Sequence, residues 1–216
     1  MIVWLASYPR SGNTFLRILL QRYFGLPTLS KYDDTHDIAA NPALAEITGH
    51  DQLQGNWADV YPQLDRSPDL HIVKTHDAPT DENKAIYILR DPRAVVVSYR
   101  RYLENFAHRT VDHLDVITGS VGFGSWASHL ESWDPLNRPN TLFLKFEDVC
   151  TNPVAAVIDI ASFLKIDPEQ AEDVDFSDLQ EIAPDFFRAG SNERNIDELD
   201  IGSAELINAL YGEQMK

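Results

Sequence analysis

The chain has 216 residues, of which 44% are hydrophobic and 24% charged, and its formal net charge is −16. This length suits one α/β domain with a sizeable core and is short for two, so a single domain over residues 1–216 is expected. Residues 147–216 carry 17 acidic and 4 basic side chains, whereas the rest of the chain has a net charge of only −3. Such an acidic chain disfavours nucleic acids and anionic membranes as partners.

The cysteine content and the first apolar run bear on location. Cys150 is the single cysteine, which excludes an internal disulfide and is typical of a reducing compartment. The apolar run at residues 2–6 follows no basic segment and is too short for a membrane-spanning helix or a signal peptide. A soluble, cytoplasmic protein without membrane insertion is therefore expected.

The N-terminal stretch predicts a strand, a loop and a helix. Residues 2–6 are short enough to form one buried strand, and residues 15–24 carry apolar side chains at helical spacing. The loop between them, residues 7–14, would aim backbone N–H groups at a point where the helix dipole favours an anion. Gly12 lets the backbone approach closely, and Arg10 adds a fixed positive charge. The pattern indicates a phosphate-binding loop, although an ordinary strand–helix turn has a similar sequence.

This loop departs from the standard nucleotide-binding pattern G-x-x-x-x-G-K-[ST]. Here the last triplet is Gly12-Asn13-Thr14, and Ser7 replaces the first glycine. The lysine that would reach the β- and γ-phosphates of ATP is missing. A P-loop kinase of small molecules, which also needs an acidic magnesium ligand, is one alternative function. A non-catalytic nucleotide-binding protein on the same fold is another.

The rest of the chain alternates strands and helices. Strands are predicted at residues 70–75, 84–89 and 141–146, and helices at residues 94–103, 124–133, 153–164 and 204–211. Residues 26–66 predict connecting structure with helical periodicity that Pro42 interrupts, residues 108–124 a mobile loop, and residues 167–184 short acidic helices. The fold class expected is α/β, a three-layer P-loop-like fold with a central, mostly parallel sheet flanked by helices.

Polar residues follow two of these later strands. Lys74 and His76 come at the end of one, and Arg90 ends the next, with Ser98 about two helical turns beyond it. Because ligands bind at the carboxyl ends of parallel strands, these side chains should gather near residues 10–14. Arg90 and Ser98 would then hold a second phosphate, as in a nucleotide that has both a 5′- and a 3′-phosphate.

These motifs, taken in order, resemble those of the PAPS-dependent sulfotransferases (PAPS is 3′-phosphoadenosine 5′-phosphosulfate) over most of the chain. Residues 8–15 match the family's phosphosulfate loop Y-P-K-S-G-T-T-W, residues 74–76 its K-T-H motif and residues 90–99 its R-[ND]-P-x-D-x-x-x-S-Y motif. Residues 146–148 match its Y-E-D strand end, and residues 188–190 its late R-x-G segment. The helix with Trp126 and Trp133 is also similar to that of the bacterial glycopeptide-antibiotic sulfotransferases.

The resemblance implies transfer of a sulfuryl group from PAPS to a hydroxyl or amine of a small molecule, such as a natural product, phenol or alcohol. The reaction would be an in-line displacement that leaves adenosine 3′,5′-bisphosphate and needs no metal. His76 would be the general base, with Lys74 and Arg10 stabilising developing charge. The implied cofactor-binding residues are Arg10, Ser11, Gly12, Asn13, Thr14, Phe15, Arg90, Ser98, Arg188 and Gly190.

Several positions differ from the family pattern. Arg10 replaces the usual lysine, and Phe15 replaces the tryptophan that would stack on adenine. The glycine and tryptophan expected shortly after Gly190 are absent, which bears on closure over the cofactor. Among the seven histidines, His36 and His113 are the alternative bases, because polar loops near a site can supply one. The sequence does not specify an oligomeric state or the acceptor.

Overall fold

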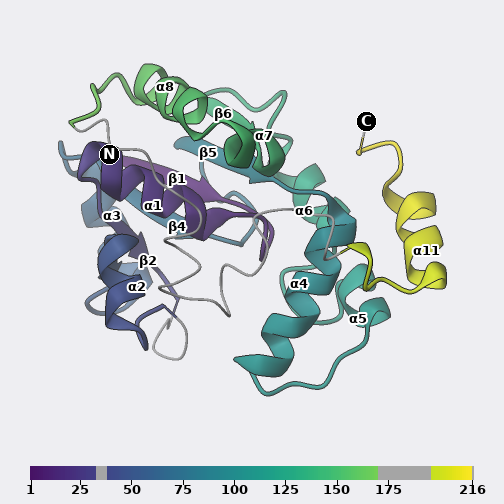
Figure 1. The fold of residues 1–216 in the computed structure, drawn as a ribbon. Coiled ribbons are helices and arrows are strands. Elements are labelled where there is room, and N and C mark those ends of the chain that lie inside the picture. Colours follow the sequence, from purple (N-terminus) through teal and green to yellow (C-terminus); the bar gives the residue numbers. More distant parts are fainter. Residues whose placement is uncertain (33–37, 170–195, 216) are drawn as a thin grey trace.

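Six parallel strands form one sheet in the part of the chain that the structure, a computed structural model, describes: residues 1–32, 38–169 and 196–215 (Figure 1). The strands are β1 (Ile2–Ala6), β2 (Thr28–Ser30), β3 (His50–Gln52), β4 (His71–Thr75), β5 (Lys84–Leu89) and β6 (Thr141–Lys145). Their order across the sheet is β3-β2-β4-β1-β5-β6. The central position of β1 places β4 on one side of it and β5 on the other.

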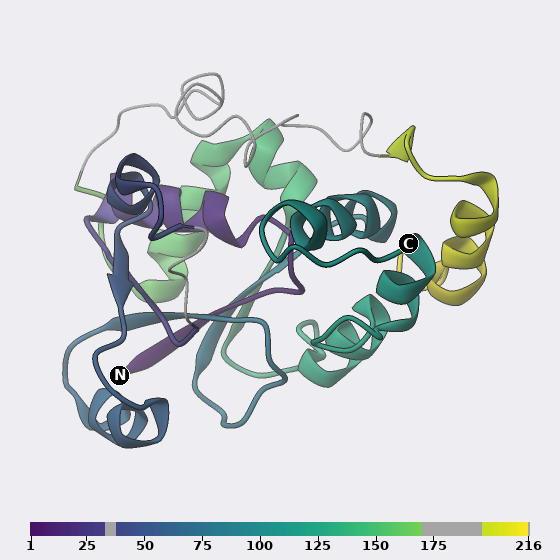
Figure 2. The ribbon, with the colours of Figure 1, turned by 90° about the horizontal axis from the view of Figure 1, so that it is seen from below.

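Helices cover both faces of this sheet. They are α1 (Asn13–Phe24), α2 (Pro42–Ile47), α3 (Trp57–Arg66), α4 (Pro92–Asn105), α5 (His113–Thr118), α6 (Trp126–Trp133), α7 (Phe146–Thr151), α8 (Pro153–Leu164) and α11 (Ile201–Tyr211). In Figure 2 the purple α1 and the green α8 lie on one side of the strands and the blue α3 on the other. The predicted three-layer α/β fold is confirmed, and every strand pair described is parallel.

Alternating side chains of β1 build two separate cores. Val3 and Leu5 pack with α1 and α8, whereas Trp4 faces the other way and packs with Trp57 and Tyr61 of α3. All five residues of β1 are buried, which is what a continuous apolar run in a parallel sheet requires. The central strand therefore fixes the loop that follows it between two packed layers.

Three predictions from the sequence differ from the structure. Strands β2 and β3 lie in residues 26–66, which were expected to be connecting structure, and both have only three residues. Pro42 begins α2 after the N-cap Asn41 instead of interrupting a helix, because proline is well suited to the first helical position. The segment expected to be a mobile loop contains α5, which begins with a capping box at Asp112 and ends at the C-cap Gly119.

A smaller cluster of apolar side chains joins α4, α5, α6 and α11 beyond the carboxyl ends of the strands (Figure 1). The terminal helix begins at Ile201, slightly earlier than expected. None of the helices in the described ranges combines the length and apolar character that crossing a membrane demands. The short helices expected at residues 167–184 lie almost entirely outside the described residues.

Candidate functional site

The carboxyl ends of β1, β4 and β5 carry the predicted site residues. In the register of the sheet, Ala6 of β1 pairs with Thr75 of β4 and with Tyr87 of β5. The loops that leave these three neighbouring strands therefore start close together, which is the ligand-binding edge of an open parallel sheet. The structure thus brings the predicted phosphate-binding loop, Lys74 with His76, and Arg90 to one edge.

The loop between β1 and α1 turns sharply at two residues. Arg10 has a φ of 66° and Gly12 a φ of 103°, both in the left-handed region. A Cβ atom on Gly12 would lie 2.3 Å from Cδ2 of Phe146, so neither the backbone angle nor the space suits a larger residue. Gly12 is the N-cap of α1, whose first N–H groups are therefore presented at this loop.

The side chains of Ser11 and Asn13 have different surroundings. The hydroxyl of Ser11 is fully buried and has no hydrogen-bond partner in the described ranges. The amide nitrogen of Asn13 instead donates to the carbonyl oxygen of Leu5 at 2.9 Å and to Oγ of Ser7 at 3.3 Å. The Asn13 side chain thus anchors the loop to β1 and leaves its backbone N–H for a ligand. A buried hydroxyl without a partner beside a helix N-terminus fits a phosphate oxygen.

Two guanidinium groups lie on the α4 side of this loop. Nε of Arg10 donates to Oγ of Ser98 at 3.3 Å, and its guanidinium carbon lies 5.3 Å from the ring centroid of Tyr102. Arg90 donates from Nη1 to the carbonyl oxygen of Arg10 at 3.1 Å and stacks over Phe146 at 4.4 Å. Ser98 thus contacts the guanidinium of Arg10 and Arg90 its carbonyl oxygen, and a second phosphate at this position stays a prediction.

The positive charges at this edge repel one another. Burial, together with the charge of Arg10, lowers the pKa of Arg90 to about 10. Arg90 remains protonated at neutral pH, and an anion between the two guanidinium groups would offset both effects. The electrostatics of the loop therefore favour a phosphate at this position.

The other predicted site residues differ in burial, and two of them are not described. Lys74 is buried, with Nζ 5.7 Å from the ring centroid of Tyr32. Phe15 is 4% exposed within the core that α1 and α8 share, so its stacking on adenine stays a prediction. Thr14 lies half-buried in the first turn of α1. Arg188 and Gly190 lie outside the described residues.

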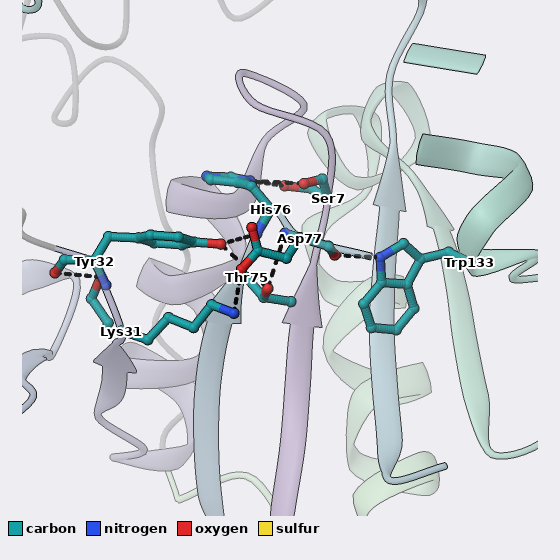
Figure 3. Close-up of polar contacts among 8 residues, drawn as sticks. Ser7, Lys31, Tyr32, Thr75, His76, Asp77 and Trp133 are labelled. Atoms are coloured by element: carbon teal, nitrogen blue, oxygen red, sulfur yellow. Dashed lines mark hydrogen bonds and ion pairs between the residues drawn. The ribbon is translucent and has the colours of Figure 1, made fainter. Parts of the chain in front are cut away.

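His76 lies just beyond β4, and Figure 3 shows it with its neighbours Ser7 and Tyr32. Its Nδ1 lies 2.7 Å from the carbonyl oxygen of Ser7. Its ring stacks on Tyr32, with centroids 5.8 Å apart and an interplanar angle of 15°. The backbone N–H of His76 donates to the Tyr32 hydroxyl at 2.7 Å. Phe123 meets the imidazole edge-on at 5.6 Å between centroids.

The surroundings of His76 keep it neutral. Burial and the positive charge of Lys74 lower the pKa of His76 well below its usual 6.5, and Arg10 acts in the same direction. The hydrogen bond to Ser7 opposes these effects without reversing them. A neutral imidazole is the form that accepts a proton.

Of the two alternative bases, His113 alone lies in the described ranges. Nδ1 of His113 lies 3.1 Å from a carboxylate oxygen of Asp200, at the start of α11. That contact holds α5 against α11. His36 is outside the described residues.

The structure adds residues that the sequence motifs did not indicate. Lys31 and Tyr32 follow β2, a strand too short and polar to predict, and Phe123 lies in the segment expected to be mobile. Phe123 has a φ of 61°, between Gly122 and Gly124, which also have positive φ. The Gly-Phe-Gly sequence is the one signal that marked this turn, because glycine tolerates that conformation.

Comparisons with known proteins identify the family of the chain. A family model of the sulfotransferase domain matches residues 2–216, so the chain belongs to the sulfotransferase domain family. Human sulfotransferase 4A1 is 27% identical over 187 residues, which cover 79% of this chain and 62% of that protein. Flavonol 3-sulfotransferase of Flaveria bidentis is 30% identical over 182 residues, covering 75% of this chain and 56% of that protein.

Two solved structures share the fold. Mouse sulfotransferase SULT7A1 complexed with PAP (adenosine 3′,5′-bisphosphate) has a TM-score of 0.68 and 22% identity, with 100% of this chain and 84% of that chain covered. Retinol dehydratase in complex with androsterone and inactive cofactor PAP has a TM-score of 0.70 and 19% identity, with 100% and 80% covered. The alignments with the two curated relatives span 62% and 56% of those proteins, well short of their full length.

Proposed function

We propose that this protein transfers a sulfuryl group from PAPS to a hydroxyl or amine of a small-molecule acceptor. The observation that carries the proposal is the arrangement at the strand ends. The partnerless Ser11 hydroxyl at the start of α1 marks one anion site, and Arg10, Arg90 and Ser98 mark a second beside it. Two anion sites of this kind suit a nucleotide with separate 5′- and 3′-phosphates. The PAP (adenosine 3′,5′-bisphosphate) in the related structures supports the same ligand.

His76 is proposed as the general base. Because a carbonyl oxygen only accepts hydrogen bonds, the contact with Ser7 requires the proton on Nδ1 and leaves Nε2 as the acceptor. Nε2 would take the proton of the acceptor hydroxyl while the acceptor oxygen bonds to sulfur and the bond from sulfur to the phosphate oxygen breaks. PAPS supplies the activated sulfuryl group.

The cations of the site would stabilise charge in this step. Lys74 lies in β4 and Arg10 in the loop after the adjacent β1, and the positive charge of each lowers the pKa of His76. They would offset negative charge on the sulfuryl group and on the departing phosphate oxygen. Among the described residues no cluster of three or more acidic, histidine or cysteine side chains could hold a metal ion.

Calorimetric titration with PAP, ATP and 5′-AMP tests the nucleotide site, and labelled PAPS with a panel of phenols, alcohols and amines tests transfer. We expect PAP to bind most tightly and transfer to persist in EDTA. Preference for ATP, with phosphate transfer that EDTA abolishes and magnesium restores, would support the kinase alternative. PAP binding without transfer to any acceptor would support the non-catalytic alternative.

A further inference from the structure

An ion pair lies directly beside the proposed base. Nζ of Lys31, at the end of β2, pairs with Oδ2 of Asp77, the residue after His76 (Figure 3). Two hydrogen bonds fix the backbone of Asp77, and a third fixes that of His76. Its N–H donates to Thr75 Oγ1 at 3.1 Å, and its carbonyl oxygen accepts from Trp133 Nε1 at 2.9 Å. Tyr32, next to Lys31, binds the N–H of His76. The pair is therefore tied to the backbone that carries the base.

Aromatic rings surround the ammonium of Lys31. Its Nζ lies 5.7 Å from the ring of Trp4, 5.6 Å from that of Tyr32 and 5.7 Å from that of Trp57, each measured to the centroid. A cation within about 6 Å of a ring face is attracted to the ring's quadrupole. Three rings and one carboxylate around one ammonium make a cation-binding pocket, which a side chain of the protein itself fills.

The two partners of the ion pair differ in accessibility. The side chain of Asp77 is 41% exposed, whereas that of Lys31 is 13% exposed. An incoming molecule therefore meets the carboxylate, and the ammonium lies behind it. A carboxylate has lone pairs for several donors, so Asp77 can accept from a ligand while it still holds Lys31.

We propose that Asp77 is a specificity-determining residue that selects acceptors carrying an ammonium group a short spacer away from the reacting hydroxyl. The inference rests on the proposed function, in which the hydroxyl points at His76. Both side chains adjoin Tyr32, because its ring stacks on His76 and Nζ of Lys31, the partner of Asp77, lies 5.6 Å from its centroid. One small molecule beside Tyr32 would therefore reach both side chains.

The geometry favours a cationic over an anionic acceptor. An anionic group would approach the exposed Asp77 carboxylate and the negative ring faces, and both repel it. The buried ammonium of Lys31 offers it little, because its charge is already paired and its exposure is low.

Three phenols of similar size test the preference: tyramine is cationic, 4-ethylphenol is neutral and 4-hydroxyphenylacetate is anionic. Each is titrated calorimetrically into the protein with and without PAP. We expect tyramine to bind roughly tenfold more tightly than either of the others. Asp77→Asn should reduce tyramine binding to the level of 4-ethylphenol and leave 4-ethylphenol unchanged. Asp159→Asn, an exposed substitution on α8, is the matched control and should change neither affinity.

Lys31→Met gives a second, opposite test. It removes the tethered competitor for Asp77, so tyramine should bind several-fold more tightly than to the unmodified protein. Strongest binding of 4-hydroxyphenylacetate, with its loss in Lys31→Met, would overturn the proposal, as would equal binding of the three phenols or no binding of any. Failure of PAP to bind would contradict the proposed function separately, while the titrations without PAP would still measure the charge preference.

Discussion

Nδ1 of His76 lies 2.7 Å from the carbonyl oxygen of Ser7, so β1 and β4 jointly fix the tautomer of the proposed base. The bond holds the imidazole by the atom that does not react and leaves Nε2 as the proton acceptor. A structural histidine with both nitrogens bonded would have no such atom.

Replacing His76 should remove catalysis and spare nucleotide binding. We expect His76→Ala to lower kcat by roughly 10²–10⁴, the usual contribution of a general base. PAP affinity should change little, since Arg10, Arg90 and Ser98 keep their contacts. Turnover, PAP titration and melting temperature of the one variant separate the roles. Near-normal kcat at saturating acceptor would exclude His76 as the base, whereas parallel losses of PAP affinity and thermal stability would indicate a structural role.

The pH dependence should reflect the lowered pKa of His76. An unperturbed histidine base would lose activity below about pH 6.5, but this one should stay neutral, and the enzyme active, to a distinctly lower pH. Between the lowered pKa and 6.5 the unfolded chain binds more protons than the folded one, so this group makes the free energy of unfolding fall as the pH drops below about 6.5. A pH–rate profile checks the activity, and a denaturant titration at each pH checks the free energy of unfolding. An acid limb centred above pH 6.5 would contradict the assignment.

The contact between Arg10 and Ser98 predicts recognition of a 3′-phosphate. Hydrogen bonds to charged groups contribute about 1.5–3 kcal/mol, so Ser98→Ala should weaken PAP binding roughly 10- to 100-fold. Binding of 5′-AMP should be weak in both proteins and nearly unchanged by the substitution. Calorimetry with the two nucleotides measures this. If the unmodified protein bound both equally well, Ser98 and Arg90 would not form a 3′-phosphate site.

Gly12 should tolerate no side chain. Gly12→Ala combines a 2.3 Å approach to Phe146 with a φ of 103°, and we expect a loss of about 2–4 kcal/mol in the free energy of unfolding. PAP affinity should fall as well, because the turn presents the N-terminus of α1. Gly202→Ala is the control: its Cβ would lie 3.4 Å from Asp200 within helix α11, where alanine is favoured. Equal stabilities of the two variants would contradict this reading of the loop.

Removing the hydroxyl of Tyr32 should affect turnover more than folding. Tyr32→Phe keeps the ring stacked on His76 but leaves the N–H of His76 without its acceptor, so we expect kcat to fall several-fold with unchanged PAP affinity. Tyr61→Phe is the matched control, since that hydroxyl binds Asp81 away from the base. Its kcat should be normal. Kinetics and melting curves of both variants test the difference, and identical kcat values would show that Tyr32 does not position His76.

The sequence predicted the parts of the molecule that long or strongly patterned segments encode. The apolar runs of β1 and β5 and the Asp91-Pro92 start of α4 all lie where expected. By contrast, β2 and β3 have three residues each, and β3 is entirely polar. Their strand conformation depends on pairing with each other and with β4, which no local pattern expresses.

Local patterns also predicted only part of the site. Motifs gave Arg10, His76 and Arg90, because each follows a recognisable strand. Lys31 and Tyr32 were missed because they follow β2. The helix α5 was missed because its capping box is Asp112 with Asp115, a less common form than serine or threonine with glutamate. The positions of Lys31 and Tyr32 in the site depend on the pairing of β2 with β4 and not on local propensity.

The central position of β1 also governs the order of events during synthesis. Ile2 pairs with His71 and Val3 with Lys84, so β1 gains its first neighbour in the sheet only once β4 has been translated and its second only with β5. Ribosomes add roughly 5–20 residues per second, and an apolar strand with both edges open is prone to associate with other chains while it waits. Expression at low temperature or with a chaperone that covers the newly made β1 should therefore raise the yield of soluble protein more than any stabilisation of the finished fold.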